Sequence, residues 1–329
     1  MVGGNISSEK IDLLIYGPNK PIVDNGFSDQ FVLHPFETKH DLERLPPALA
    51  GKIRGAAVTY STVRGDSTTL SLFPKLEIVS SFGVGYDHID ANYARDHNIV
   101  VTNTPDVLTE EVADIAMGLL IATLREFIKA DRYLRSGLWM THNFPLSVGS
   151  LRDRKVGMVG MGRIGQAIGR RLDASRVPVA YHSRNPADGV SYKHYPDLIE
   201  MAKAVDTLVV IVPGGALTAK MINADVMKAL GPRGVIINVA RGSVIDEPAL
   251  IAALKSGTIL AAGLDVFANE PTVPDELRTM QNVVLLPHIG SASVVTRNAM
   301  DQLVVDNLKA WFAGKAPLTP IPETPVKGR

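Results

Sequence analysis

Short runs of apolar residues alternate along this chain with longer segments in which apolar residues recur every three or four positions. Short runs bounded by Gly, Pro, Asn or Asp are typical of buried strands, and the longer period is typical of helices. Their alternation predicts parallel sheets built from strand–helix–strand units, and therefore an α/β fold. The strands predicted for the first third of the chain cover residues 11–16, 31–33, 56–60, 76–82 and 99–102.

A second series of six predicted strands suits a doubly wound sheet. Between the two series, the apolar period that starts at Thr109 predicts one long helix ending before Ser136. That helix is apolar enough to be an ordinary core helix, or one that bridges domains or packs against another subunit. A last helix is predicted over residues 294–312, before a proline-rich end. The strands of the second series cover residues 155–159, 177–181, 207–212, 234–239, 260–266 and 283–286.

Two sets of strands in 329 residues fit a prior of roughly two domains. The first set has no closing helix of its own, so we expect the C-terminal segment to return to it. The predicted domains are therefore residues 1–104 with 291–329, and residues 105–290.

Composition narrows the classes of partner and chemistry. Lys plus Arg and Asp plus Glu both number 34, and no basic run could follow a phosphate backbone, which argues against nucleic acid. With no cysteine, a disulfide and a thiolate nucleophile are excluded. Neither a leader-like start nor a long apolar stretch is present, so we expect no membrane contact and a cytoplasmic location. No metal is expected, because Asp87, His88 and Asp90 lack further ligands nearby.

A glycine-rich turn follows the strand predicted at 155–159 and opens a helix. Gly160 permits a tight turn, Gly162 lets the backbone approach a pyrophosphate, and Gly165 lets helix and strand pack closely. N–H groups at the helix start, around Arg163 and Ile164, would then face the phosphates. The pattern predicts a dinucleotide site, although a purely structural turn has the same glycines.

The next predicted strand ends in His182, and no carboxylate follows where an NAD enzyme carries one for the ribose 2′-hydroxyl. Arg184 could instead neutralise a 2′-phosphate, with Ser183 and Asn185 donating hydrogen bonds. NADP(H) is therefore the preferred cofactor and NAD(H) a possible one. No partner is evident from the sequence for His182 or His194.

Three charged residues, Arg241, Glu270 and His288, follow the ends of three other predicted strands. The carboxyl ends of parallel strands share one edge of a sheet, so these residues and the glycine turn would open onto one crevice. Hydride transfer to a 2-oxo acid needs a cation for the carboxylate and an acid for the carbonyl oxygen. Arg241 could supply the cation and His288 the proton, with Glu270 orienting the imidazole and favouring its charged form.

Two further features are open to a functional or a structural interpretation. Asp265 could bond the nicotinamide carboxamide or cap the end of its strand. The glycines around Val84 could present backbone N–H groups to a substrate carboxylate, or could simply form a tight turn.

Taken together, these motifs resemble the D-isomer-specific 2-hydroxyacid dehydrogenases, in particular the NADPH-dependent glyoxylate/hydroxypyruvate reductases. The resemblance spans nearly the whole chain. It rests on SSFGVGYD at 80–87, NTPDVLT at 103–109, the glycine turn at 160–165, VARG at 239–242, GLDVF at 263–267 with Glu270 and Pro271, and LPHIGS at 286–291.

The resemblance implies a central Rossmann-type nucleotide domain and a flavodoxin-like substrate domain formed by both termini. It also implies a homodimer, in which Trp139 would reach the neighbouring subunit's substrate site. Backbone groups at Val84 and Gly85 would bind substrate. Further cofactor contacts would come from Val212, Pro213, Thr218, Val239, Ala240 and Gly290.

The expected function is reduction of glyoxylate or hydroxypyruvate to the D-2-hydroxy acid by hydride transfer from NADPH, with His288 as general acid. One alternative is an NAD-linked dehydrogenase of another 2-hydroxy acid. The other is a non-catalytic, dinucleotide-sensing scaffold on the same fold.

Overall fold

The computed structural model describes residues 10–18, 20–59, 64–324 and 326. The chain divides into two compact units, of which unit 1 comprises residues 1–108 and 293–329 and unit 2 residues 109–292. The predicted division followed residues 104 and 290. The two units are described separately.

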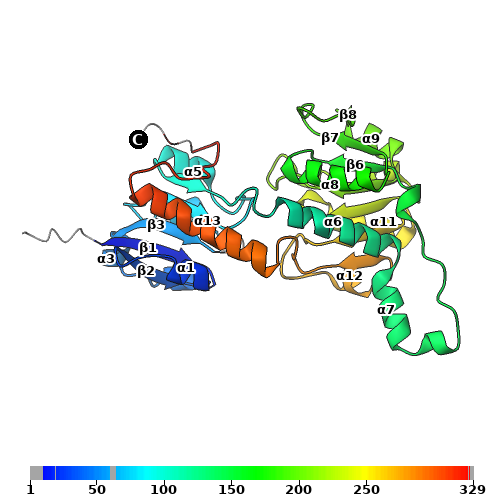
Figure 1. Ribbon diagram of the computed structural model, residues 1–329, viewed down its shortest axis with the longest axis horizontal. Helices are drawn as coiled ribbons and strands as arrows, with labels where there is room; N and C mark the ends of the chain where they lie inside the picture. The colour runs from blue at the N-terminus through cyan, green and yellow to red at the C-terminus, as the bar shows by residue number, and fades with distance from the viewer. Residues whose placement is uncertain (1–9, 19, 60–63, 325, 327–329) are drawn as a thin grey trace, which may run out of the picture. The chain divides into compact units, whose positions relative to one another are not determined.

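The described residues of unit 1 form a five-stranded sheet in the order β2-β1-β3-β4-β5, with every neighbouring pair parallel (Figure 1). This is the flavodoxin-like order of a doubly wound sheet. Strand β2 continues through Pro35, which an edge strand tolerates because one side of its backbone needs no partner. Residue 60, the predicted end of the third strand, lies outside the described residues. The strands are β1 (Ile11–Tyr16), β2 (Phe31–Phe36), β3 (Ile53–Val58), β4 (Ile78–Ser81) and β5 (Val100–Thr102).

The long helix α13 (Val294–Phe312) brings the end of the chain back to unit 1. It packs on β3 and β4 and against α1, with Val304 and Leu308 fully buried. Beyond it, the N–H of Ile321 donates to the carbonyl of Val101 in β5 at 2.9 Å. The shorter helices are α1 (Pro21–Asn25), α2 (Lys39–Leu42), α3 (Pro47–Ala50), α4 (Ser67–Leu70) and α5 (Ala91–Asp96).

The described residues of unit 2 form a seven-stranded parallel sheet in the order β12-β11-β10-β9-β6-β7-β8. The order reverses between β6 and β9, which is the place where sheets of this class bind ligands. The sequence predicted six of these strands and missed β8. The strands are β6 (Val156–Val159), β7 (Val179–His182), β8 (Lys193–Tyr195), β9 (Thr207–Val210), β10 (Val235–Asn238), β11 (Ala261–Leu264) and β12 (Val283–Leu285).

The predicted long helix of unit 2 is wrong, because it is two helices. Helix α6 (Thr109–Leu124) packs on α8 and on β10, β11 and β12, whereas α7 (Phe127–Arg135) starts in a new direction. The break lies at Glu126, whose φ of 52° is left-handed and cannot continue an α-helix. The remaining helices are α8 (Arg163–Ala174), α9 (Leu198–Ala204), α10 (Ala224–Leu230), α11 (Glu247–Ser256) and α12 (Asp275–Thr279), with 3-10 turns at Leu138–Met140, Leu151–Asp153 and Gly242–Val244.

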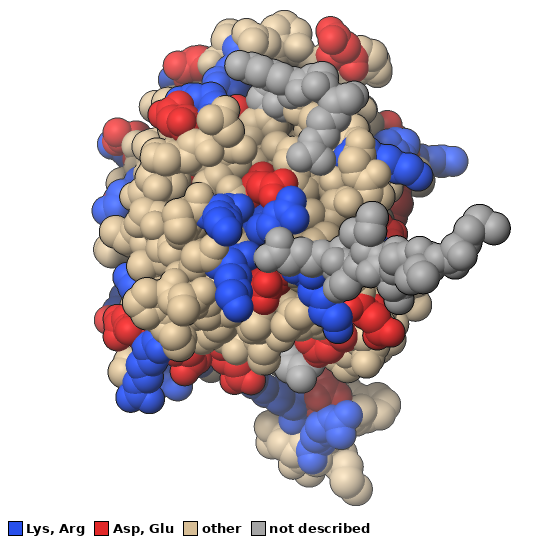
Figure 2. Space-filling view, turned by 90° about the vertical axis from the view of Figure 1, so that its left-hand side faces the viewer, with Lys and Arg blue, Asp and Glu red and all other residues tan. Residues whose placement is uncertain are grey.

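The parallel α/β fold expected from the sequence is confirmed. The central strands of unit 2, β6, β9 and β10, are fully buried and rich in Val, Ile and Leu, as strands covered on both faces must be. On the face drawn in Figure 2, acidic and basic side chains are interspersed among uncharged residues. No helix in the described part of the chain is long and apolar enough to cross a membrane.

Candidate active site

The glycine turn between β6 and α8 has the geometry that a pyrophosphate requires. Gly160 has a φ of +103°, and a Cβ there would lie 2.7 Å from the carbonyl oxygen of Ile211. A Cβ on Gly165 would lie 2.5 Å from the carbonyl oxygen of Gly160. At Gly162, in contrast, a Cβ would meet nothing within 4 Å, so the turn leaves open space at the N-terminus of α8. This space and the helix dipole suit a phosphate group.

His288 and Glu270, 18 positions apart in sequence, are in direct contact. The His288 Nδ1 lies 2.8 Å from Glu270 Oε2, and the other carboxylate oxygen accepts the N–H of Phe267 at 3.0 Å. Because a carboxylate only accepts hydrogen bonds, Nδ1 carries the proton and Nε2 is the nitrogen left to exchange one. Both side chains are partly exposed, at 32% and 25%, so a substrate could reach them.

Asp265 holds the loop that carries His288. Its two carboxylate oxygens accept the N–H groups of Ile289 at 2.7 Å and Gly290 at 2.8 Å, and its carbonyl accepts the N–H of His288 at 2.9 Å. These bonds fasten a loop in which His288 has a left-handed φ of 54°. Burial raises the pKa of Asp265, against the opposing effect of the two backbone N–H groups. These bonds give Asp265 a structural role, and its contact with the nicotinamide carboxamide stays a prediction.

Arg241 lies three residues after the last residue of β10. Its Nη1 donates to the carbonyl of Ala240 at 2.8 Å. The Asn238 side chain donates to the carbonyl of Arg241 and accepts the N–H of Ala240, each at 3.0 Å. A Cβ on the next residue, Gly242, would overlap the backbone of Phe267, so only glycine lets this turn lie against the Glu270 loop. The sequence analysis missed this role, although a glycine directly after a candidate arginine was a visible signal.

The pKa of Glu270 depends on both His288 and Arg241. Burial raises its pKa, but the hydrogen bond and charge of His288, the N–H of Phe267 and the charge of Arg241 outweigh that effect, so the pKa is lowered. A lowered carboxylate pKa means that the ionised form stabilises the folded state at neutral pH. This stabilisation disappears as the pH falls through the lowered value.

We therefore expect the melting temperatures of the wild type and Glu270→Gln to differ near neutral pH and to converge in acid. Convergence should begin only below about pH 4.3, the ordinary pKa of a glutamate. Thermal melts of both proteins between about pH 3 and 8 provide the measurement. A difference that already shrinks between about pH 5 and 7 would contradict the lowered pKa.

The remaining predicted residues of unit 2 fall into two places. Most follow the carboxyl ends of the strands, at the same edge as the glycine turn: Ser183, Arg184, Asn185, Val212, Pro213, Thr218, Val239, Ala240 and Gly290. Trp139 does not, because it lies in the 3-10 turn after α7 and is 62% exposed. Val84 and Gly85 belong to unit 1, where they follow β4.

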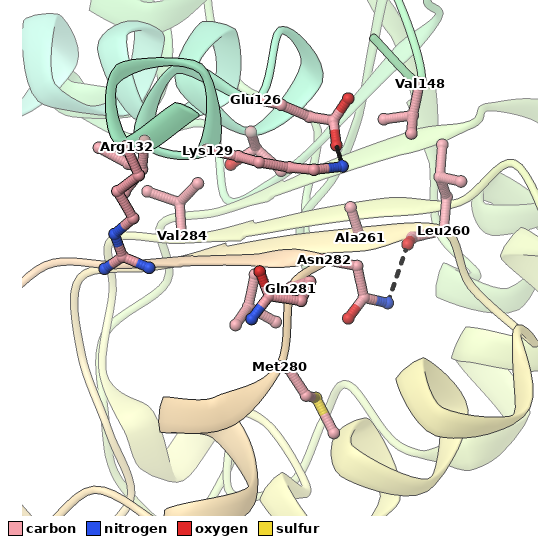
Figure 3. Close-up of a pocket in the computed structure, with 13 residues that line it drawn as sticks. Glu126, Lys129, Arg132, Val148, Leu260, Ala261, Met280, Gln281, Asn282 and Val284 are labelled. Carbon is pink, nitrogen blue, oxygen red and sulfur yellow. Dashed lines mark hydrogen bonds and ion pairs between the residues drawn. The ribbon is translucent and has the colours of Figure 1, made fainter. Parts of the chain in front are cut away.

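A pocket of unit 2 lies at the other edge of the sheet (Figure 3). Leu260, Ala261, Val283 and Val284 contribute from the amino ends of β11 and β12, and residues of the α6–α7 segment form the other wall. Two of its charged side chains, Lys129 and Glu126, pair with each other at 2.9 Å. The pocket therefore contains none of the residues singled out for hydride transfer.

Comparisons with known proteins agree with this geometry. Residues 117–290 match the family model described as D-isomer specific 2-hydroxyacid dehydrogenase, NAD binding domain. Glyoxylate/hydroxypyruvate reductase A of Arabidopsis thaliana is 45% identical, covering 95% of this chain and 99% of that protein. Hydroxyphenylpyruvate reductase of Plectranthus scutellarioides is 42% identical over the same shares.

Among solved structures, the chain resembles the NADPH-dependent glyoxylate/hydroxypyruvate reductase of Sinorhizobium meliloti in complex with NADP and malonate. The two are 52% identical, with a TM-score of 0.92, over 98% of this chain and 99% of that one. The resemblance inferred from the motifs is thus confirmed over nearly the full length. The chain belongs to the family of D-isomer specific 2-hydroxyacid dehydrogenases.

Proposed function

We propose that this protein reduces a small 2-oxo acid, glyoxylate or hydroxypyruvate, to the D-2-hydroxy acid with NADPH as hydride donor. The observation that carries the proposal is the His288–Glu270 contact at 2.8 Å, on the same sheet edge as Arg241 and the glycine turn. A scaffold that only senses dinucleotides needs no proton donor. The relatives named above act on substrates of this class.

His288 and Arg241 would perform complementary tasks. With Nδ1 bonded to Glu270, protonated His288 can donate from Nε2 to the carbonyl oxygen as negative charge develops there. Arg241 can hold the substrate carboxylate through two parallel hydrogen bonds. The bound cofactor would supply the hydride. Reduction consumes a proton and oxidation releases one, so raising the pH should favour the reverse reaction.

The cofactor preference rests on the loop after β7. Its first three residues are Ser183, Arg184 and Asn185, and none of them is a carboxylate that would repel a 2′-phosphate. The Sinorhizobium meliloti structure contains NADP. We therefore infer NADP(H) as the preferred cofactor, with NAD(H) as a possible one.

Unit 1 would contribute backbone donors to the substrate. The turn after β4 is fixed because Thr104 Oγ1 accepts the N–H of Gly83 at 2.9 Å and Asn103 Nδ2 donates to the carbonyl of Val84 at 2.8 Å. Within the described residues, no intrachain hydrogen bond involves the N–H of Val84 or Gly85. Two fixed and unused N–H groups suit a carboxylate.

We also propose a homodimer, and the surface of α7 supports this proposal. None of the nine residues of this helix is buried, and Figure 1 shows it extending from the body of unit 2. Its apolar side chains Phe127, Ile128 and Leu134 are 53%, 44% and 55% exposed, and Leu138 and Trp139 continue the surface. An isolated helix this short is marginal in water. A second copy of the chain would cover it and would place Trp139 against its partner.

We expect the double variant Phe127→Ser with Leu134→Ser to elute as a monomer. Removing two apolar anchors from the centre of an interface weakens association strongly. Light scattering after gel filtration measures the mass directly. Leu217→Ser is the matched control, because Leu217 is 82% exposed but distant in sequence from α7, and it should leave the mass unchanged. A wild-type monomer, or a double variant that remains dimeric, would contradict this assignment.

The proposed function is tested by initial rates for glyoxylate, hydroxypyruvate, pyruvate and an aryl pyruvate, each with NADPH and with NADH. The highest kcat/KM should occur with NADPH and one of the first two acids. Faster turnover with NADH and another acid would favour the alternative dehydrogenase. Cofactor binding without turnover of any acid would favour the scaffold.

A further inference from the structure

We propose that His194 is a positioning residue that favours NADPH over NADH by fixing the loop of residues 183–185. This inference rests on the proposed function, in which that loop binds the 2′-phosphate. His194 lies on β8, the strand that the sequence analysis missed, and had no partner evident from the sequence.

The His194 ring supports the first residue of the loop from the neighbouring strand. Its Nε2 lies 2.9 Å from the carbonyl oxygen of Ser183. Since a carbonyl only accepts, Nε2 carries the proton. The register pairs His194 with Tyr181, and the two ring centroids lie 5.0 Å apart. Tyr181 is only 2% exposed, so the ring rests on the core of unit 2 rather than on a mobile surface group.

The same loop is held at further points. Ser183 Oγ donates to the carbonyl of Asn185 at 2.5 Å, and the Tyr181 hydroxyl accepts the N–H of Ala187 at 2.9 Å. Exposed Arg184 therefore lies between two fastened positions. A loop ordered before binding loses less conformational freedom when a ligand arrives. Losing the His194 bond should thus weaken phosphate binding without removing any group that contacts the phosphate.

This effect should depend on the phosphate. The side chains of Arg184 and Asn185 would bind the 2′-phosphate directly, whereas a plain ribose gives them no charged partner. The pyrophosphate of both cofactors would be bound elsewhere, at the glycine turn, which His194 does not contact through any described hydrogen bond. A merely structural role would instead affect both cofactors alike.

The experiment compares His194→Leu with His194→Gln. Leucine removes the donor, while glutamine can place its amide nitrogen near the former Nε2. We expect His194→Leu to raise the KM for NADPH about three- to tenfold, the range of one ordinary hydrogen bond. The KM for NADH and both kcat values should change less than about twofold, and His194→Gln should restore most of the loss.

Calorimetric titration with adenosine 2′,5′-bisphosphate and with adenosine 5′-monophosphate gives a readout independent of turnover. Only the bisphosphate should bind His194→Leu more weakly. His182→Leu is the matched control, because His182 Nδ1 makes an equally long bond of 2.9 Å to the carbonyl of Tyr195, which lies outside the loop. It should change the affinities for the two nucleotides by the same factor.

The outcomes separate the two proposals. If the wild type prefers NADPH but His194→Leu weakens both nucleotides equally, or neither, this inference is overturned and the proposed function stands. If the wild type shows no preference for NADPH or for the bisphosphate, the proposed cofactor fails and the inference fails with it. If His194→Leu does not fold, His194→Phe with the same titrations decides, since it also lacks the donor.

Discussion

Replacing His288 by alanine is expected to slow reduction of the 2-oxo acid by on the order of 10²–10⁴-fold. The variant loses the imidazole that Glu270 orients at 2.8 Å and therefore the proton donor for the carbonyl oxygen. The loss should be in kcat, because the cofactor would be held by other residues. Single-turnover measurements at saturating NADPH isolate the hydride step.

Two further variants are measured for comparison with His288→Ala. His97→Ala removes an exposed imidazole that stacks on Tyr93 at 3.8 Å and has no part in the proposed mechanism, so its rate should stay near that of the wild type. Glu270→Gln retains an acceptor for His288 Nδ1 but no charge, and its rate should lie between those of the wild type and His288→Ala. A His288→Ala variant within tenfold of the wild type would remove His288 from the role of acid.

Replacing Arg241 by alanine should lower kcat/KM for the 2-oxo acid by on the order of 10³-fold, the usual cost of truncating one partner of a desolvated charge pair. Arg241→Lys should recover only part of this loss, because an ammonium cannot form two parallel bonds to a carboxylate. The loss should appear mainly in the KM for the 2-oxo acid, with the KM for NADPH within about threefold of the wild type.

The control for Arg241 is Arg278→Ala, which removes an exposed guanidinium of α12 that pairs with Asp275. Its kcat/KM should be unchanged. If Arg241→Ala instead raised the KM for NADPH and left that for the acid intact, Arg241 would belong to the cofactor site, and the proposed substrate clamp would be wrong.

Much of the fold could be predicted because the buried strands are apolar and have clear limits. Strand β1 and helix α13 begin and end where the pattern placed them. Strand β8 could not be found this way, because it has three residues, Lys193, His194 and Tyr195, none of which is buried. An edge strand this polar obtains its structure from pairing with β7 and not from its own pattern.

The break between α6 and α7 escaped prediction for a related reason. Neither glycine nor proline marks it, and the left-handed residue is Glu126, whose side chain pairs with Lys129 at 2.9 Å. Local sequence favours helix here, so the surrounding structure must impose the turn.

In the candidate site, the shared edge at the carboxyl ends of parallel strands predicted which charged residues follow the same edge of the sheet. The same argument could not predict hydrogen bonds to the backbone. The bonds from Asp265 to the His288 loop depend on a fold that single residues do not reveal.

The division of unit 1 between the two ends of the chain has a consequence for synthesis. When residues 1–108 leave the ribosome, α13 has not yet been translated, so the surfaces of β3 and β4 that it covers remain exposed to water. Residues 109–292 contain every strand of the second sheet and are complete earlier. The 184 codons of unit 2 are therefore translated before the last helix of unit 1, and during that interval unit 1 has an incompletely covered sheet.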